Sequence, residues 1–232
     1  MNAVKQKLAA GKVVTMVNPD FQHPRLVEYL AGLGMDVSFI DAERMSYDFE
    51  RIEEMTRAAH LAGIASMARA WMNDPGLIVR YFDCGLDGMA FPHVEDAATA
   101  RRMVEIVRYA RPKDHADKIV IVMAETPAAI GRLDEIAAVP GVDVVNIGVN
   151  DLALALGHPG QPEHPEVARL VDQGIGRILK NGKHVALNVL DNWEERMPLL
   201  ISKGVRWLNV RARVFLARGA RQYTELLRRH AP

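Results

Sequence analysis

Short apolar runs alternate along the chain with longer segments in which apolar residues recur every three or four positions. The run from Ile119 to Met123 is apolar at every position, which is typical of a strand buried on both faces of a parallel sheet. Segment 47–62 places Ile52, Met55 and Ala59 on one face, as an amphipathic helix does. Strands are therefore expected at 13–17, 36–40, 64–68, 88–91, 118–123, 142–147, 184–188 and 206–210, and helices at 24–33, 47–62, 74–84, 95–109, 127–139, 165–181, 193–203 and 214–230.

This alternation amounts to eight strand-helix units in 232 residues, or 29 residues per unit (232/8). Glycines stand shortly before most of the expected strands, as turn residues between a helix and the next strand do. The rhythm predicts an α/β fold, a single (β/α)8 TIM barrel that forms one domain over residues 1–232. A doubly wound open sheet is the main alternative, and the lack of a Gly-x-Gly-x-x-Gly segment after any strand weakens a dinucleotide-binding interpretation.

The composition narrows the classes of partner and compartment. Lys plus Arg and Asp plus Glu number 29 each, so the charge balance predicts no nucleic acid and no anionic membrane as partner. The one cysteine, Cys84, excludes an intramolecular disulfide framework and fits a reducing compartment. The polar first residues lack the apolar core of a signal peptide, and no apolar stretch approaches the ~20 residues of a membrane span. We expect a cytoplasmic protein.

Carboxylates follow two neighbouring expected strands. Glu125 ends the run that begins at Ile119, and Asp151 follows the next run, 26 residues later (151 − 125). Because the carboxyl ends of parallel strands meet at one end of a barrel, the two could share a hard divalent cation. The alternative is that each only caps the helix that follows it, and the spacing alone does not choose between them. Arg69 ends the third strand and would add a cation for a small anionic substrate.

Six short segments, in order, resemble the HpcH/HpaI aldolase family of the citrate lyase β-like and pyruvate/phosphoenolpyruvate barrel superfamily. Each is weak alone, but together they run through nearly the whole chain at barrel spacing. They are Ile40-Asp41-Ala42-Glu43, Ala68-Arg69-Ala70-Trp71, Tyr81-Phe82-Asp83-Cys84-Gly85, Ala124-Glu125-Thr126, Gly148-Val149-Asn150-Asp151-Leu152 and Gly157-His158-Pro159-Gly160.

The resemblance implies class II aldolase chemistry on a 2-oxo acid. Glu125 and Asp151 would bind Mg²⁺, Mn²⁺ or Co²⁺, and Arg69 would stabilise the oxygen of a pyruvate enolate. Backbone N–H groups around Asn150 and Asp151, in the segment that begins at Gly148, would hold the substrate carboxylate. The resemblance further implies that Asp41 and Glu43 order the surroundings of the metal, and that the protein is a homo-oligomer, a hexamer by analogy.

Three departures from the family pattern change the expected chemistry. Arg44 stands where the family has the acid-base His, and an arginine stays charged and cannot accept a proton at neutral pH. We expect Arg44 either to neutralise its family partner, Asp83, or to bind a distal substrate anion. His93, after the fourth strand, is the candidate replacement, with a structural histidine as the alternative. A Pro- and Gly-rich family segment is reduced to 111–117, and Met123 replaces a Gln.

The sequence therefore predicts a metal-dependent carbon-carbon lyase of the aldolase type, with Arg69, Asp83, Arg44 and His93 as catalytic candidates. Two alternative functions are also enzymatic: decarboxylation of an oxaloacetate-like acid and lysis of an acyl-CoA thioester. A third is a degenerate barrel that binds a 2-oxo acid without cleaving it.

Overall fold

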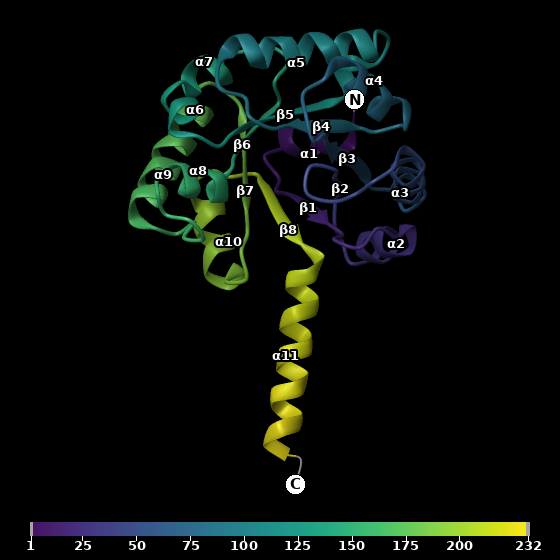
Figure 1. Ribbon diagram of the computed structural model, residues 1–232, viewed down its shortest axis with the longest axis vertical. Coiled ribbons are helices and arrows are strands. Elements are labelled where there is room, and N and C mark those ends of the chain that lie inside the picture. Colours follow the sequence, from purple (N-terminus) through teal and green to yellow (C-terminus); the bar gives the residue numbers. More distant parts are fainter. Residues whose placement is uncertain (1, 231–232) are drawn as a thin grey trace.

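Each expected strand pairs in parallel with the next one along the chain, and the eighth pairs with the first, so the sheet closes into a barrel (Figure 1). The computed structural model describes residues 2–230. The predicted (β/α)8 fold is confirmed. The strands are β1 (Val14–Asn18), β2 (Val37–Asp41), β3 (Ala65–Arg69), β4 (Gly88–Phe91), β5 (Ile119–Ala124), β6 (Val144–Ile147), β7 (His184–Asn188) and β8 (Trp207–Arg211).

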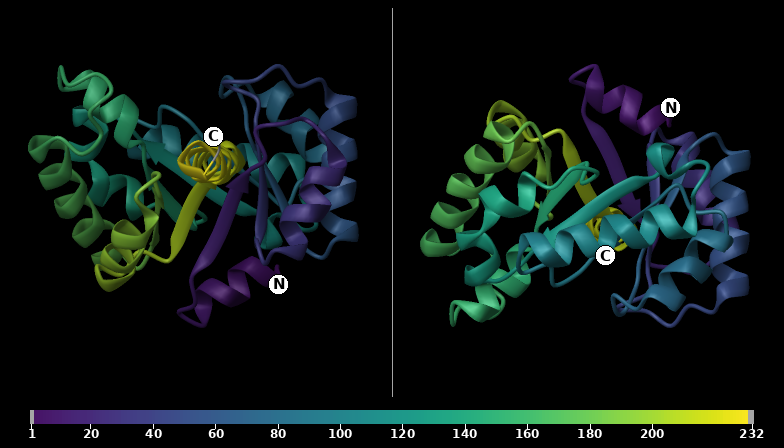
Figure 2. Two further views of the ribbon diagram at one scale, coloured as in Figure 1. Left: turned by 90° about the horizontal axis from the view of Figure 1, so that it is seen from below. Right: turned by 90° about the horizontal axis from the view of Figure 1, so that it is seen from above.

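Most of the helices lie around the outside of the closed sheet (Figure 2). Three of them begin at an aspartate, Asp48, Asp74 or Asp96, whose carboxylate accepts a backbone N–H of the first turn. The full set of helices in the described chain is α1 (Ala3–Ala9), α2 (Pro24–Gly32), α3 (Phe49–Leu61), α4 (Pro75–Asp83), α5 (Ala97–Ala110), α6 (Pro127–Gly131), α7 (Leu133–Ala137), α8 (Val149–Ala155), α9 (Pro165–Lys180), α10 (Trp193–Ser202) and α11 (Ala212–His230), with a 3₁₀ turn at His115–Asp117.

Two differences from the expected elements bear on the carboxyl end. The single helix expected at 127–139 is two short helices, α6 and α7, joined at Arg132. Helix α8 begins at Val149, directly after β6, so Asn150 and Asp151 lie in its first turn. The backbone N–H groups of a first turn have no partner inside their own helix.

Alternation along the strands divides the core into two layers. One set of side chains fills the barrel interior, and the other packs against the helices. Both faces are apolar, which explains the unbroken apolar run of β5. The interior set consists of Val4, Leu8, Val14, Met16, Val37, Phe39, Met67, Ala90, Ile119, Ile121, Met123, Val144, Ala186 and Trp207.

The amino end of the barrel is closed. Val4 and Leu8 of α1 are buried in the interior cluster, so this helix covers the opening. Asp36, Asp87 and Asp143 immediately precede β2, β4 and β6, and each accepts the backbone N–H of a residue in the preceding strand, at 2.7, 2.9 and 2.9 Å. Because this end is filled and hydrogen-bonded, open space in the barrel lies at the carboxyl end.

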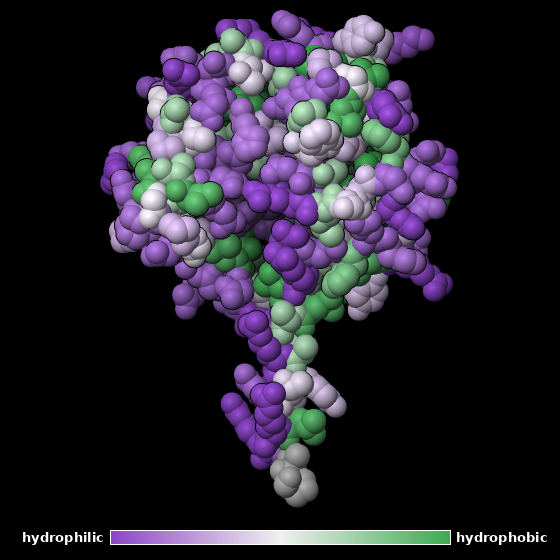
Figure 3. All heavy atoms as spheres, viewed as in Figure 1, coloured by the Kyte–Doolittle hydropathy of each residue, from purple (hydrophilic) through white to green (hydrophobic). Residues whose placement is uncertain are grey.

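Helix α11 leaves the end of β8 and projects from the body as a stalk (Figures 1 and 3). Along it, Leu216, Tyr223, Leu226 and Leu227 are exposed. Among residues 2–230, no helix combines the length and apolar character needed to cross a membrane.

Candidate active site

A cavity of about 1120 Å³ opens at the carboxyl end of the barrel. Its walls include Asp41 at the end of β2, Arg69 at the end of β3, and Gly148, Asn150 and Asp151 around the start of α8. Active sites of this fold lie at this end because the strand ends and the loops that follow them converge there. The structure therefore brings together most of the residues that the sequence singled out.

Arg69 is buried and held by two carboxylates. Its Nε and Nη2 donate to the two carboxylate oxygens of Asp41, each at 3.0 Å. Its Nη1 lies 3.0 Å from Oε2 of Glu43. This two-pronged pairing fixes the plane of the guanidinium. Asp41 and Glu43, which the resemblance placed around the metal, therefore position the arginine.

Glu125 is 1% exposed, and its two carboxylate oxygens have different surroundings. Oε1 accepts the backbone N–H of His93 at 2.8 Å and lies 3.0 Å from Nδ1 of the same residue. Oε2 is buried and has no hydrogen-bond partner among the described residues. Burial raises the pKa of Glu125, and the nearby charge of Asp151 raises that pKa further, whereas His93 and Arg69 act to lower it.

The donor set fits a hard divalent cation. A buried carboxylate oxygen without a partner is unfavourable, and a cation shared with Asp151 would remove that penalty. Gly148 provides the space beside it, because a Cβ there would lie only 2.7 Å from Oε2 of Glu125. The site thus depends on a residue without a side chain at the end of β6.

His93 contacts Glu125 through both its backbone and its ring, and its own backbone conformation is unusual. Its φ of 54° lies in the left-handed region, which a residue other than glycine adopts only under local constraint. Its side chain is 63% exposed, and it does not line the large cavity. The geometry supports a role in holding the Glu125 carboxylate, through both the backbone and the ring.

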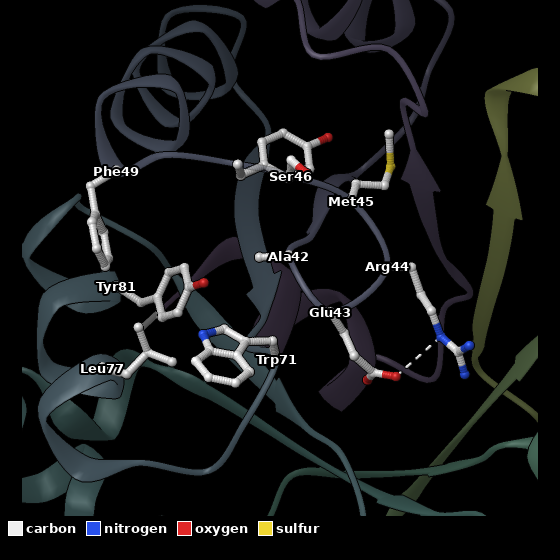
Figure 4. Close-up of a pocket in the computed structure, with 10 residues that line it drawn as sticks. Ala42, Glu43, Arg44, Met45, Ser46, Phe49, Trp71, Leu77 and Tyr81 are labelled. Carbon is white, nitrogen blue, oxygen red and sulfur yellow. Dashed lines mark ion pairs between the residues drawn. The ribbon is translucent and has the colours of Figure 1, made fainter.

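Arg44 does not pair with Asp83. Its Nε lies 3.1 Å from Oε1 of Glu43 (Figure 4). Its Nη2 donates to Oδ1 of Asp151 at 3.2 Å. Asp83 is exposed at the last residue of α4, and no salt bridge joins it to Arg44 within the described chain. Within this chain Arg44 therefore pairs with Glu43 and Asp151 in place of Asp83, and its binding of a distal substrate anion, the other role expected for it, stays a prediction.

Arg44 and Met45 separate the large cavity from a smaller one. The smaller cavity, of about 400 Å³, lies between the segments that follow β2 and β3 (Figure 4). Trp71, Leu77 and Tyr81 form one of its sides, and Glu43 with Arg44 forms another. The 54% exposed side chain of Arg44 is thus accessible from both spaces.

Asp20, Asn146 and Asn209 also line the cavity, and they were not singled out from the sequence. Asp20, with a φ of 63°, accepts from Nε of Arg211 at 2.7 Å and from the backbone N–H of Arg213 at 2.9 Å. Asn146 and Asn209 line the cavity from β6 and β8, and Nδ2 of Asn209 donates to Oδ1 of Asn146 at 3.0 Å. The period of two places Asn146 on the same strand face as Val144, and Asn209 on the same face as Trp207 and Arg211, but the sequence alone does not say that this face is the inner one.

Comparisons with known proteins identify the family of this chain. The family described as HpcH/HpaI aldolase/citrate lyase matches residues 16–195. The pyruvate aldolase of Rhizobium etli is 31% identical, with 95% of each chain covered. An HpcH/HpaI aldolase from Desulfitobacterium hafniense shares the fold with a TM-score of 0.89 at 24% identity, over 100% of this chain and 98% of that one.

A more distant neighbour is the protein CitE from Mycobacterium tuberculosis, solved in complex with magnesium and pyruvate. It matches with a TM-score of 0.64 at 18% identity, over 88% of this chain and 86% of that one, so it supports the fold alone. The match over residues 16–195, together with the full-length similarity to a curated aldolase, establishes that this chain belongs to the HpcH/HpaI aldolase/citrate lyase family.

Proposed function

We propose that this protein is a divalent-metal-dependent carbon-carbon lyase that acts on a 2-oxo acid through a pyruvate enolate. The observation that carries the proposal is that a guanidinium of fixed orientation lies near a carboxylate suited to binding a metal ion. Arg69 is held by Asp41 and Glu43, and the Glu125 carboxylate nearby has a buried oxygen with no partner.

Glu125 and Asp151 would hold Mg²⁺, Mn²⁺ or Co²⁺. Bound there, the cation would supply Lewis-acid charge to the oxygens of the 2-oxo acid. The magnesium and pyruvate bound by the neighbour CitE support this assignment by analogy of fold.

Arg69 would stabilise the enolate oxygen. Its charge is already oriented by two carboxylates, so little reorganisation is needed when negative charge develops on the substrate. In the segment that begins at Gly148, the backbone N–H groups of Asn150 and Asp151, in the first turn of α8, would hold the substrate carboxylate, because the Gly148 N–H already donates to the Ala124 carbonyl at 3.0 Å.

Arg44 cannot remove the proton of a C4 hydroxyl, because a guanidinium stays protonated. Decarboxylation of an oxaloacetate-like acid releases CO₂ and requires no such proton removal. We therefore infer that this second activity depends on Arg69 and the carboxylate pair alone. The contact of Arg44 with Asp151 also leaves it able to meet a distal substrate anion at the cavity mouth.

The test uses the full chain with Mg²⁺ or Mn²⁺. Wild-type protein should exchange the methyl protons of pyruvate for deuterium and release pyruvate from oxaloacetate, and both activities should stop on chelation. A barrel that binds oxalate or pyruvate by calorimetry but shows neither reaction would be the degenerate binding protein, and the lyase proposal would be wrong.

We also propose a homo-oligomer, with a hexamer by family analogy. The projecting helix α11 exposes apolar side chains, including Leu216, Tyr223 and Leu226, that a second copy of the chain would cover. Light scattering should give a multiple of the 25.8 kDa chain mass, and a monomer at micromolar concentration would contradict this.

A further inference from the structure

Two histidines and a glutamate come together where the loop after α8 enters α9. His158 lies in the loop, His164 is the last residue before α9, and Glu166 stands in the first turn of that helix. We name these three residues the imidazole cluster. None of them lines the large cavity, although Pro159 and Gly160 of the same loop do.

The loop is folded so that its two imidazole rings stack. The backbone N–H of His158 donates to the Ala153 carbonyl of α8 at 2.8 Å, and that of His164 donates to the Gln161 carbonyl at 3.0 Å. The ring centroids of His158 and His164 are 3.5 Å apart, with an interplanar angle of 18°. Backbone turns therefore bring the two rings together without any bound ligand.

Glu166 adds a charged oxygen to the two rings. Its Oε2 lies 2.9 Å from Nε2 of His158, and its backbone N–H donates to Nδ1 of His164 at 3.3 Å. The hydrogen bond from His158 lowers the pKa of Glu166, so the carboxylate is charged at neutral pH. Within residues 2–230, no lysine or arginine forms a salt bridge with this carboxylate.

The imidazole cluster offers the ligand types that zinc prefers. Two imidazole nitrogens and one carboxylate oxygen, with water in the fourth position, form a known coordination set for Zn²⁺, and Cu²⁺ and Ni²⁺ also bind imidazole. Mg²⁺ instead prefers oxygen ligands alone. The imidazole cluster and the pair of Glu125 and Asp151 are therefore suited to different ions.

The spacing of the ligand atoms is close to what such an ion requires. One atom from each of the three side chains lies within 4.8 Å of the other two. A tetrahedral zinc ion, with bonds of about 2.0–2.2 Å, holds its ligand atoms about 3.4 Å apart. The side chains of His158 and Glu166 are 24% and 45% exposed, so they can rotate to close this difference, and an ion can reach them from solvent.

We propose that the imidazole cluster is a second metal site, which binds Zn²⁺ through one nitrogen each of His158 and His164 and one carboxylate oxygen of Glu166. The ion would take the place of the hydrogen bond between His158 and Glu166, and the ring proton of His158 would move to its other nitrogen. Because Pro159 and Gly160 lie between the two histidines, the ion would also fasten this part of the cavity wall to the start of α9. The proposal does not depend on the lyase function.

The alternative is that the imidazole cluster is only structural, with His164 as the cap of α9 and His158 in an exposed ion pair. The chain contains a second exposed pair of this kind for comparison. Nε2 of His60 lies 2.8 Å from Oδ2 of Asp87, and no third metal-ligating side chain of the described chain joins them. A histidine-carboxylate pair alone should bind Zn²⁺ weakly.

The test titrates Zn²⁺ into the full chain by calorimetry, in a Glu125→Gln background that removes a proposed ligand of the barrel site. One Zn²⁺ per chain should bind, and excess Mg²⁺ should not compete. Adding His164→Asn should weaken this binding by more than about 100-fold, because even residues that only orient metal ligands are worth about 10–100-fold. Asparagine keeps the cap of α9, since its side-chain oxygen can accept the same backbone N–H.

His60→Gln is the matched control and should keep the full Zn²⁺ affinity. If His164→Asn does not fold, as judged by thermal unfolding, His158→Gln serves instead, because it keeps a donor toward Glu166 and should lose the ion equally. In NMR spectra of the histidine ring nitrogens, Zn²⁺ should shift the signals of His158 and His164 and leave those of His60 in place.

Three results would overturn the second metal site. They are no Zn²⁺ binding in the Glu125→Gln background, unchanged affinity after His164→Asn or His158→Gln, and an equal loss in His60→Gln, which would indicate binding by scattered surface histidines. Displacement of Zn²⁺ by excess Mg²⁺ would also overturn it, because the ion would then occupy a site of oxygen ligands. The lyase proposal is judged separately, by pyruvate methyl exchange in wild type.

Discussion

Replacing Glu125 with Gln should abolish metal binding while leaving the fold intact. The glutamine oxygen can keep the hydrogen bond from the His93 N–H, which is 2.8 Å in the wild type. The new amide nitrogen would occupy the position of Oε2, where no protein group forms a hydrogen bond. The substitution therefore breaks no internal contact, and it removes one of the two charged ligands.

The magnitude follows from linkage between metal binding and folding. Mn²⁺ at 100 times its dissociation constant should stabilise wild type by about 2.7 kcal/mol. For a chain of 232 residues this raises the melting temperature by about 5–10 °C. Glu125→Gln should show almost none of this shift.

Without metal, Glu125→Gln should have a higher melting temperature than wild type above neutral pH. Burial raises the pKa of Glu125 in the folded state, so its favourable contribution is complete below the unfolded-state pKa of about 4.3 and is lost as pH rises through the folded-state pKa. Under chelation at pH 8, Glu125→Gln should therefore melt above wild type, and the difference should shrink toward pH 4.

The assay is thermal unfolding with Mn²⁺ or EDTA, together with calorimetric titration of Mn²⁺. Glu95→Gln is the matched control, since Glu95 pairs with the hydroxyl of Thr126, and it should keep the full metal-induced shift. Equal Mn²⁺ affinity in wild type and Glu125→Gln would refute the assignment of Glu125 as a ligand.

Four further substitutions test the rest of the site. Arg69→Lys keeps the charge and loses the two-pronged pairing, so deuterium exchange into pyruvate should fall by about 10²–10³-fold, and undiminished exchange would remove Arg69 from the mechanism. Arg44→His should raise aldol cleavage relative to oxaloacetate decarboxylation, and a lower ratio in an efficient wild-type aldolase would contradict our account of the base. His93→Gly relieves the backbone at a φ of 54°, whereas His93→Ala does not, so urea denaturation should find the glycine variant more stable by about 1 kcal/mol, and equal stabilities would show that this backbone is unstrained. Gly148→Ala places a Cβ 2.7 Å from Oε2 of Glu125, so calorimetry should show weaker Mn²⁺ binding although no ligand has changed, and wild-type affinity would mean that the site tolerates the methyl group.

The sequence by itself determined the barrel and the residues at its strand ends. Apolar runs at a regular spacing, each followed by an amphipathic segment, specify strand-helix units through local hydrophobic periodicity. Glu125 and Arg69 could be placed at the carboxyl end because each directly follows such a run. These are local properties, and closure of the barrel did not change them.

Tertiary structure alone decided which side chains meet. Arg44 reaches Asp151, 107 positions later in the chain, and this depends on how the loops after β2 and β6 fold over the mouth. The orientation of Asn146 and Asn209 was likewise hidden, because in a parallel barrel both faces of each strand are buried and alternation does not say which face is inside. Only closure of β8 onto β1 brings Asn18 to the same side of the cavity as Asn146, Asn188 and Asn209, since side-chain neighbours across a barrel are set by its register and not by spacing along the chain.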